Sequence, residues 1–73
     1  MLLAADEVEA VVQVDGRVRD RLRVPADVDE RRLHELALAT AGVARASSGR
    51  EVVRVVVRAP RVVNVVTRAA KTG

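Results

Sequence analysis

The residues best suited to chemistry in this 73-residue chain are arginines, and four of them occupy every second position from 17 to 23. Val18, Leu22 and Val24 alternate with them, which is the pattern of a strand with one buried face and one solvent-exposed face. A guanidinium group binds phosphate through a planar fork of N–H donors, so a row of this kind points to a polyanion. The opposite strand face is predicted to be apolar.

The second half of the chain is also basic. Beyond Leu36 the only acidic residue is Glu51, whereas the basic residues there are Arg45, Arg50, Arg54, Arg58, Arg61, Arg68 and Lys71. The net charge of +3 points only weakly to a polyanion, but this basic second half makes nucleic acid a candidate partner, although a solvated basic surface explains the charge equally well. Because the chain has no aromatic residue, ring stacking on bases is excluded, and contacts to the phosphates of a folded RNA are favoured.

The other polar residues do not form a recognisable catalytic or metal-binding set. His34 is the only histidine and the chain has no cysteine, so no metal site is expected. Ser47 and Ser48 lie in a predicted loop without a base beside them. We therefore expect no catalysis, no cofactor and no small-molecule substrate. No apolar run reaches the roughly 18 residues that would span a membrane, and a cytoplasmic location is expected.

The arginine row belongs to a predicted hairpin of strands 8–14 and 17–24, with Asp15-Gly16 between them. A two-residue turn would mix valines with arginines on both faces. We therefore expect a three-residue loop with Gly16 as a left-handed bulge residue, which places Val12 opposite Val18. Asp20 then falls on the apolar face, near the sheet margin or paired with an arginine.

A helix is predicted after Pro25, with Asp29 as its N-cap and Gly42 as its C-terminal cap. Its inward stripe is Leu33, Leu36, Ala37 and Thr40, and residues 43–46 add a further helical turn. Valine-rich strands follow at 51–58 and 62–67, forming a second hairpin. Val53, Val55 and Val57 are expected to share one face of the first of these strands, whereas the second has valines on both faces.

This order predicts an α+β fold, a small and mainly antiparallel four-stranded sheet in the order β-β-α-β-β with one helix on one face. Residues 1–7 are expected to be a frayed lead-in, 8–68 one domain and 69–73 a disordered tail. Met1 stands so close to the first strand that we expect an excised piece of a larger protein.

Four short motifs resemble, in order, the small C-terminal domain of bacterial leucyl-tRNA synthetase. They are Val-Gln-Val-Asp-Gly-Arg-Val-Arg at 12–19, Val-Pro-Ala-Asp at 24–27, the helical Leu-Ala-Leu-Ala at 36–39, and Arg-Val-Val-Asn-Val-Val at 61–66. Asp15 stands where the family has Asn, and Arg17 and Arg61 stand where it has Lys. Ala59-Pro60 replaces the usual Pro-Gly, so the second turn is expected to differ.

The resemblance implies a non-catalytic module tethered to a synthetase that charges leucine tRNA, contacting the outer corner and long variable arm of that tRNA. Arg17, Arg19 and Arg61 match family motifs and are predicted to contact RNA, with Arg21, Arg54 and Arg58 adding supporting charge. Asn64 is expected to bond backbone or turn groups. The alternative is a protein-interaction or oligomerisation module that uses a valine-rich sheet surface, comprising Val52, Val56, Val62 and Val66.

Overall fold

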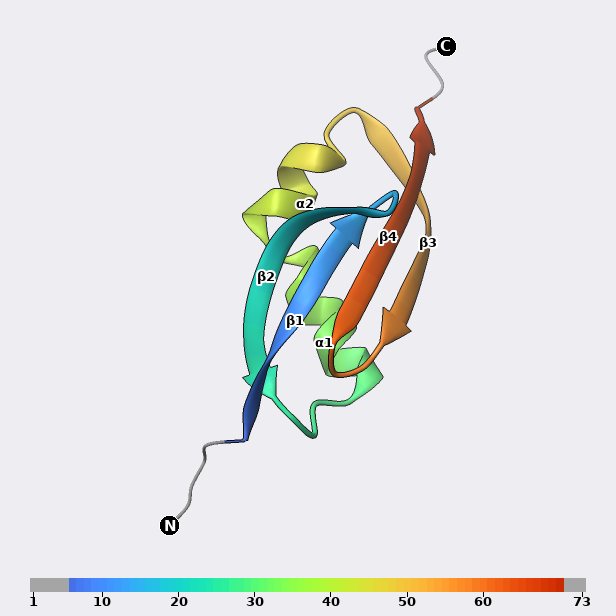
Figure 1. The fold of residues 1–73 in the computed structure, drawn as a ribbon. Helices are drawn as coiled ribbons and strands as arrows, with labels where there is room; N and C mark the ends of the chain where they lie inside the picture. Colours follow the sequence, from blue (N-terminus) through green and yellow to red (C-terminus); the bar gives the residue numbers. More distant parts are fainter. Residues whose placement is uncertain (1–5, 71–73) are drawn as a thin grey trace.

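The computed structural model describes residues 6–70 and has two β-hairpins separated by two helices (Figure 1). The elements are β1 (Glu7–Val14), β2 (Arg17–Pro25), α1 (Glu30–Leu38), α2 (Ala41–Ala46), β3 (Arg50–Arg58) and β4 (Val62–Ala69). The predicted α+β class and the element order are confirmed. The expected lead-in and tail fall mostly on residues 1–5 and 71–73, which lie outside the described residues.

The four strands form one sheet in the order β2-β1-β4-β3. The two hairpin pairs are antiparallel, whereas β1 and β4 pair in parallel at the centre, with Val11 beside Val62 and Val14 beside Val65. The sheet is therefore mixed rather than purely antiparallel. Both helices pack on the same face, which leaves the other face of the sheet open (Figure 1).

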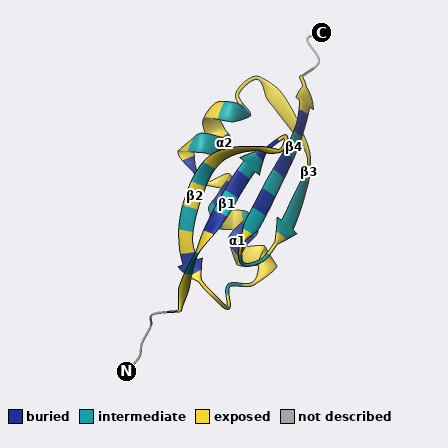
Figure 2. Ribbon diagram, in the orientation of Figure 1, coloured by how far each residue is buried: buried dark blue, intermediate teal, exposed yellow. Residues whose placement is uncertain are grey.

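The core lies between the two central strands and the helices. Its largest fully buried side chains are Val12, Val24, Val63 and Val65 from the sheet and Leu33 from α1. Buried residues alternate along β1 and β4 (Figure 2), because only one face of each strand meets the helices. The ambiguous last strand is thereby resolved, since Val63, Val65 and Thr67 point inward and Val62 and Val66 lie on the open face.

The turn of the first hairpin differs from the predicted three-residue loop. Asp15 (φ 53°) and Gly16 (φ 82°) both have positive φ, as the central residues of a two-residue type I′ turn do, so Val14 pairs with Arg17. The extra residue is instead Arg19, which forms a bulge in β2, and Val12 pairs with Asp20. The predicted loop was wrong because Asp, like Asn, tolerates the left-handed conformation that the tighter turn needs.

The helical region also divides differently from the prediction. Asp29 is the N-cap of α1, as predicted, and accepts from Arg32 N at 2.7 Å. The α1 helix ends at Leu38, and Gly42 lies inside α2 rather than capping α1. Thr40 is buried, as predicted for the inward stripe, but it is the N-cap of α2: its hydroxyl group accepts from Val43 N at 3.2 Å and donates to Ala37 O at 2.8 Å.

The close approach of α2 to β2 explains the position of Asp20. Its carboxylate points towards the helices and accepts from Gly42 N at 3.0 Å, which satisfies a free amide of the first helical turn. A second bulge, in β3, corrects another expectation. It lies between Val52 and Arg54, so Val53 does not share the inward face of Val55 and Val57 and is 46% exposed.

Candidate nucleic-acid interface

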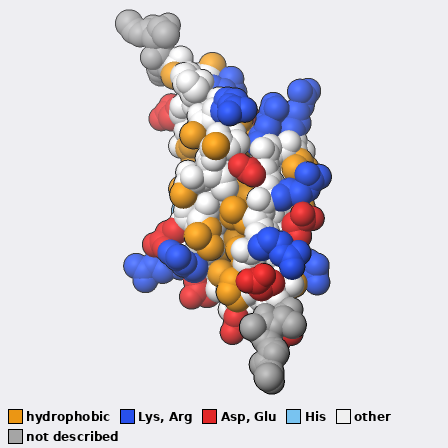
Figure 3. All heavy atoms as spheres, turned by 90° about the vertical axis from the view of Figure 1, so that its left-hand side faces the viewer, with side chains coloured by type: hydrophobic (Ala, Val, Ile, Leu, Met, Phe, Trp, Pro, Cys, Tyr) orange, Lys and Arg blue, Asp and Glu red, His pale blue; other side chains and the backbone are white. Residues whose placement is uncertain are grey.

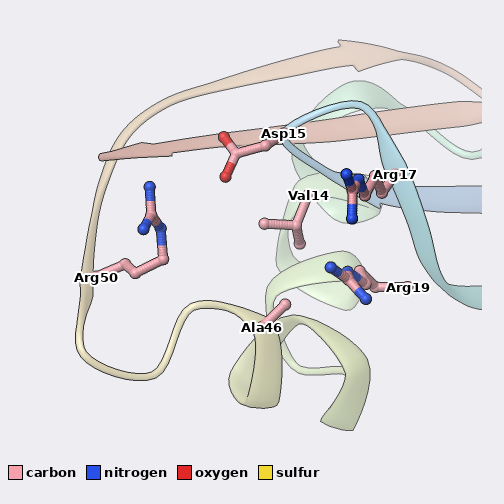
Figure 4. Close-up of a pocket in the computed structure, with 6 residues that line it drawn as sticks. All are labelled: Val14, Asp15, Arg17, Arg19, Ala46 and Arg50. Carbon is pink, nitrogen blue, oxygen red and sulfur yellow. The ribbon is translucent and has the colours of Figure 1, made fainter. Parts of the chain in front are cut away.

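A groove edged by arginines is formed between the first hairpin, α2 and the start of β3 (Figure 4). A hollow of about 400 Å³ is lined by Val14, Asp15, Arg17, Arg19, Ala46 and Arg50. A smaller one of about 210 Å³ adjoins it through Arg19 and Ala46 and adds Arg45. We call this combined surface, with Arg17, Arg19, Arg45 and Arg50 at its edges, the arginine groove.

Three separate elements bring these arginines together. Arg17 follows the tight turn directly, and Arg19 is the bulged residue of β2. Because Gly42 has no side chain, α2 lies against the Arg19–Asp20 backbone and holds Arg45 beside Arg19. Arg50 begins β3 after the α2–β3 loop. In Figure 4, Arg50 lies on one side of the hollow and Arg17 and Arg19 on the other, with Val14 and Ala46 between them.

The turn that leads into the groove is anchored to β4. Asp15 N donates to Val65 O at 2.8 Å, and Gly16 N donates to Asn64 Oδ1 at 3.0 Å. The prediction that Asn64 bonds a turn group is therefore confirmed. These bonds hold the positive-φ residues of the turn, so Arg17 starts from a fixed point of the backbone.

A chain of hydrogen bonds links the same turn to Arg50. Asp15 accepts from Thr67 N at 2.8 Å and from the Thr67 hydroxyl at 2.6 Å, and Arg50 Nε donates to Thr67 Oγ1 at 2.8 Å. The bonds from Thr67 lower the pKa of Asp15, and the charges of Arg50 and Arg19 lower it further. The carboxylate that lines the groove is therefore ionised and directed at Thr67.

Several arginines elsewhere are paired with carboxylates. The N···O distances are 4.0 Å for Arg21–Glu9, 3.8 Å for Arg23–Glu7 and 2.9 Å for Arg68–Glu51. Within residues 6–70, by contrast, none of the four groove arginines forms an ion pair with Asp or Glu. The face shown in Figure 3 accordingly carries mainly basic side chains at its upper end and mixed charges lower down. Unpaired arginines retain more donors for an external anion.

The six predicted contact residues do not form one surface. Arg17 and Arg19 lie together in the groove, whereas Arg21 lies on the open face and pairs with Glu9. Arg54 and Arg58 lie on the open-face side of β3, and Arg61 is in the β3–β4 turn. Sequence reasoning missed Arg45 and Arg50 as groove residues, because only the basic bias of the second half signalled them.

The open face of the sheet is the second surface of note. Val11, Val56, Val62 and Val66 are half-buried there without a helix over them. Val52, which was also predicted on this surface, instead pairs with the inward-facing Thr67 because of the β3 bulge, and it lies on the other side of the sheet, 43% exposed. Among residues 6–70 no group of His, Cys, Asp and Glu could hold a metal ion. Neither helix in this part of the chain has the length and apolar character needed to cross a membrane.

Comparison with known proteins gives leucine–tRNA ligases of several bacteria as sequence relatives. The chain is 57% identical over 65 residues to a leucine–tRNA ligase of Paenarthrobacter aurescens, 54% over 65 residues to one of Acidothermus cellulolyticus, and 42% over 66 residues to one of Corynebacterium diphtheriae. These matches cover 89–90% of the chain but only 7–8% of each relative. No family model matches the sequence.

The fold also matches a solved structure. It superimposes with a TM-score of 0.77 and 22% identity on part of a crystal structure described as the ternary complex of Agrobacterium radiobacter K84 agnB2 LeuRS, tRNA and LeuAMS. The match covers 88% of this chain and 8% of that one.

Proposed function

We propose that this chain, which belongs to the family of the small C-terminal domain of leucine–tRNA ligases, is a non-catalytic tRNA-binding accessory domain. The chain spans about 8% of the length of the ligases that it matches. The observation that carries the proposal is the arginine groove, in which four arginines that form no ion pair within residues 6–70 edge a hollow also lined by Val14, Asp15 and Ala46. The groove binds the phosphate backbone, and the rest of the synthetase, in the cytoplasm, performs ATP-dependent leucylation.

Physical chemistry supports backbone contacts over base readout. Arginine forks match phosphate oxygens in a bidentate manner, and the groove offers no aromatic ring for stacking. With a net charge of only +3, the isolated chain is expected to bind modestly. Tethering to an enzyme that already holds the tRNA raises the effective concentration, so a weak contact is sufficient. We place that contact at the outer corner and long variable arm of leucine tRNA.

The experiment is a salt titration of binding to leucine tRNA, to a tRNA with a short variable arm, and to a plain RNA duplex. Arg17→Ala with Arg19→Ala is expected to weaken binding to leucine tRNA and to lower the log–log salt slope by about 1–2 units, since each lost phosphate contact removes somewhat under one. The matched control is Arg23→Ala with Arg68→Ala, which removes the same charge from two paired arginines.

Three results would count against the proposal. A slope unchanged by the groove variant removes Arg17 and Arg19 from the interface. Equal losses in both double variants indicate a generic basic surface. Equal affinity of the wild-type chain for all three RNAs removes the preference for leucine tRNA.

Arg54, Arg58 and Arg61 are proposed as secondary contacts, because within the described chain they too have no ion pair; Arg54 and Arg58 share the open-face side of β3, and Arg61 lies in the turn that follows. Arg21 is the weakest of the predicted contacts, because it must leave Glu9 to reach RNA.

The alternative function is a protein-interaction module, favoured by the half-buried valines of the open face. Concentration-dependent self-association without RNA binding, measured by sedimentation, would support that alternative.

A further inference from the structure

We propose that Thr67 is a positioning residue of the arginine groove: held by Asp15, its hydroxyl fixes Arg50 opposite Arg17 and Arg19. The inference rests on the proposed function of the groove and adds to it a residue that touches no RNA. Thr67 is only 8% exposed and lies on the inward side of β4, so it acts through Arg50.

The polarity of the hydrogen bonds determines which way the Thr67 hydroxyl faces. A threonine hydroxyl has one proton to donate and lone pairs to accept with. The ionised Asp15 carboxylate can only accept, and it takes that proton at 2.6 Å while also accepting from Thr67 N at 2.8 Å. Two bonds from one residue fix the carboxylate, and the Thr67 oxygen is left with its lone pairs free. Arg50 Nε fills that acceptor site at 2.8 Å.

The bond uses a single donor of Arg50. The Nε–H group is directed at Thr67, so the terminal N–H groups of the guanidinium remain available for an anion in the groove. Figure 4 shows Arg50 and Asp15 on the side of the hollow away from Arg17 and Arg19. Arg50 is otherwise an exposed side chain that would spread over many rotamers in water. Fixing it in advance lowers the entropy lost on binding.

Stability alone does not require this arrangement. The turn is already anchored by the bonds to Val65 O and Asn64 Oδ1, and an exposed Nε–H group would be satisfied by water. The contact between Thr67 and Arg50 therefore gives direction to a side chain rather than satisfying a buried donor. Thr67→Val keeps the shape of the buried side chain and removes the hydroxyl, and Thr67→Ser restores the hydroxyl.

Two measurements on the 73-residue chain test the proposal. In tRNA binding, Thr67→Val is expected to lose about 2- to 10-fold in affinity, the cost of ordering one arginine side chain, with an unchanged salt slope because every charge remains. Thr67→Ser is expected to bind as the wild type does. In ¹⁵N-resolved NMR of the free chain, the Arg50 Nε–H signal is expected to be protected from exchange in the wild type and Thr67→Ser, and unprotected in Thr67→Val.

The outcomes separate the inference from the proposed function. If Arg17→Ala with Arg19→Ala weakens binding but a folded Thr67→Val binds as the wild type does, the inference fails and the groove stands. If Thr67→Ser fails to restore affinity, the hydroxyl is not the cause and the inference also fails. If the wild-type chain binds no RNA, the proposed function fails. An unprotected Arg50 Nε–H signal in the wild-type chain would overturn the positioning by Thr67, whatever the RNA-binding result.

Discussion

Replacing Gly42 by alanine is expected to destabilise the domain, although alanine is ordinarily the better helix former. Gly42 lies in α2, directly against the bulge of β2. A Cβ atom at this position would lie 2.9 Å from Asp20 Cβ and would collide with the carbonyl group of Arg19. Two of the three obstructing atoms belong to the backbone, so the clash is relieved only if α2 moves away from β2.

The expected magnitude follows from two opposing terms. Overpacking of a well-fitted contact costs about 1–3 kcal/mol. The gain in helix propensity on replacing glycine by alanine is at most ~1 kcal/mol. Subtracting a gain of that size leaves a net loss of up to about 2 kcal/mol, which in a domain of this size lowers Tm by up to roughly 15 °C. The movement of α2 would also strain the bond from Gly42 N to Asp20, which adds in the same direction.

Thermal unfolding followed by circular dichroism measures the effect. Ala44→Gly is the matched control, because Ala44 is an exposed residue of the same helix and reports the local value of helix propensity without a steric term. If Gly42→Ala raises Tm by about as much as Ala44→Gly lowers it, alanine realises its full helix propensity, the close approach of α2 to β2 is not a constraint, and the reasoning is refuted.

Two further predictions concern the first hairpin. Gly16→Val is expected to lower stability by about 1–2 kcal/mol, because Gly16 has φ 82° and a β-branched residue is strained there; an unchanged urea midpoint would contradict this. Stability is also expected to fall as the pH drops below about 4. Hydrogen bonds lower the pKa of Asp15 and Asp20 in the folded chain below the value of 3.8 for a free carboxyl, so acid protonates these groups in the unfolded chain first and favours unfolding. Asp15→Asn with Asp20→Asn should flatten that dependence in urea titrations at several pH values, and parallel curves for variant and wild type would disprove it.

The sequence predicted the elements well because alternation and capping are local signals. Asp29 is followed by an apolar stripe at helical spacing, and it caps α1 as expected. Asn64 also does what was expected of it. Alternation, however, reports only which face a residue occupies. Val12 was predicted to pair with Val18, and it pairs instead with Asp20, two positions further along β2. In either pairing Val12 and its partner lie on the same face of the sheet, so alternation does not distinguish the two registers. The pattern therefore could not show where the extra residue lies.

The candidate site was predicted in part for a related reason. Arg17 and Arg19 were identified because they lie in a strongly patterned strand. Arg45 and Arg50 reach the same groove through contacts between distant segments, namely the packing of Gly42 on β2 and the bond between Arg50 and Thr67. No local pattern encodes such contacts. The parallel pairing of β1 with β4 was missed in the same way, since it joins segments from opposite ends of the chain.

That central parallel pair also determines how the domain responds to mechanical force. β1 begins at one end of the molecule and β4 ends at the other, and the two strands run side by side (Figure 1). A pull transmitted through the chain at both ends loads the ladder between β1 and β4 in shear, so its hydrogen bonds share the tension instead of opening one after another. The domain is therefore expected to resist extension along the line that joins the start of β1 to the end of β4.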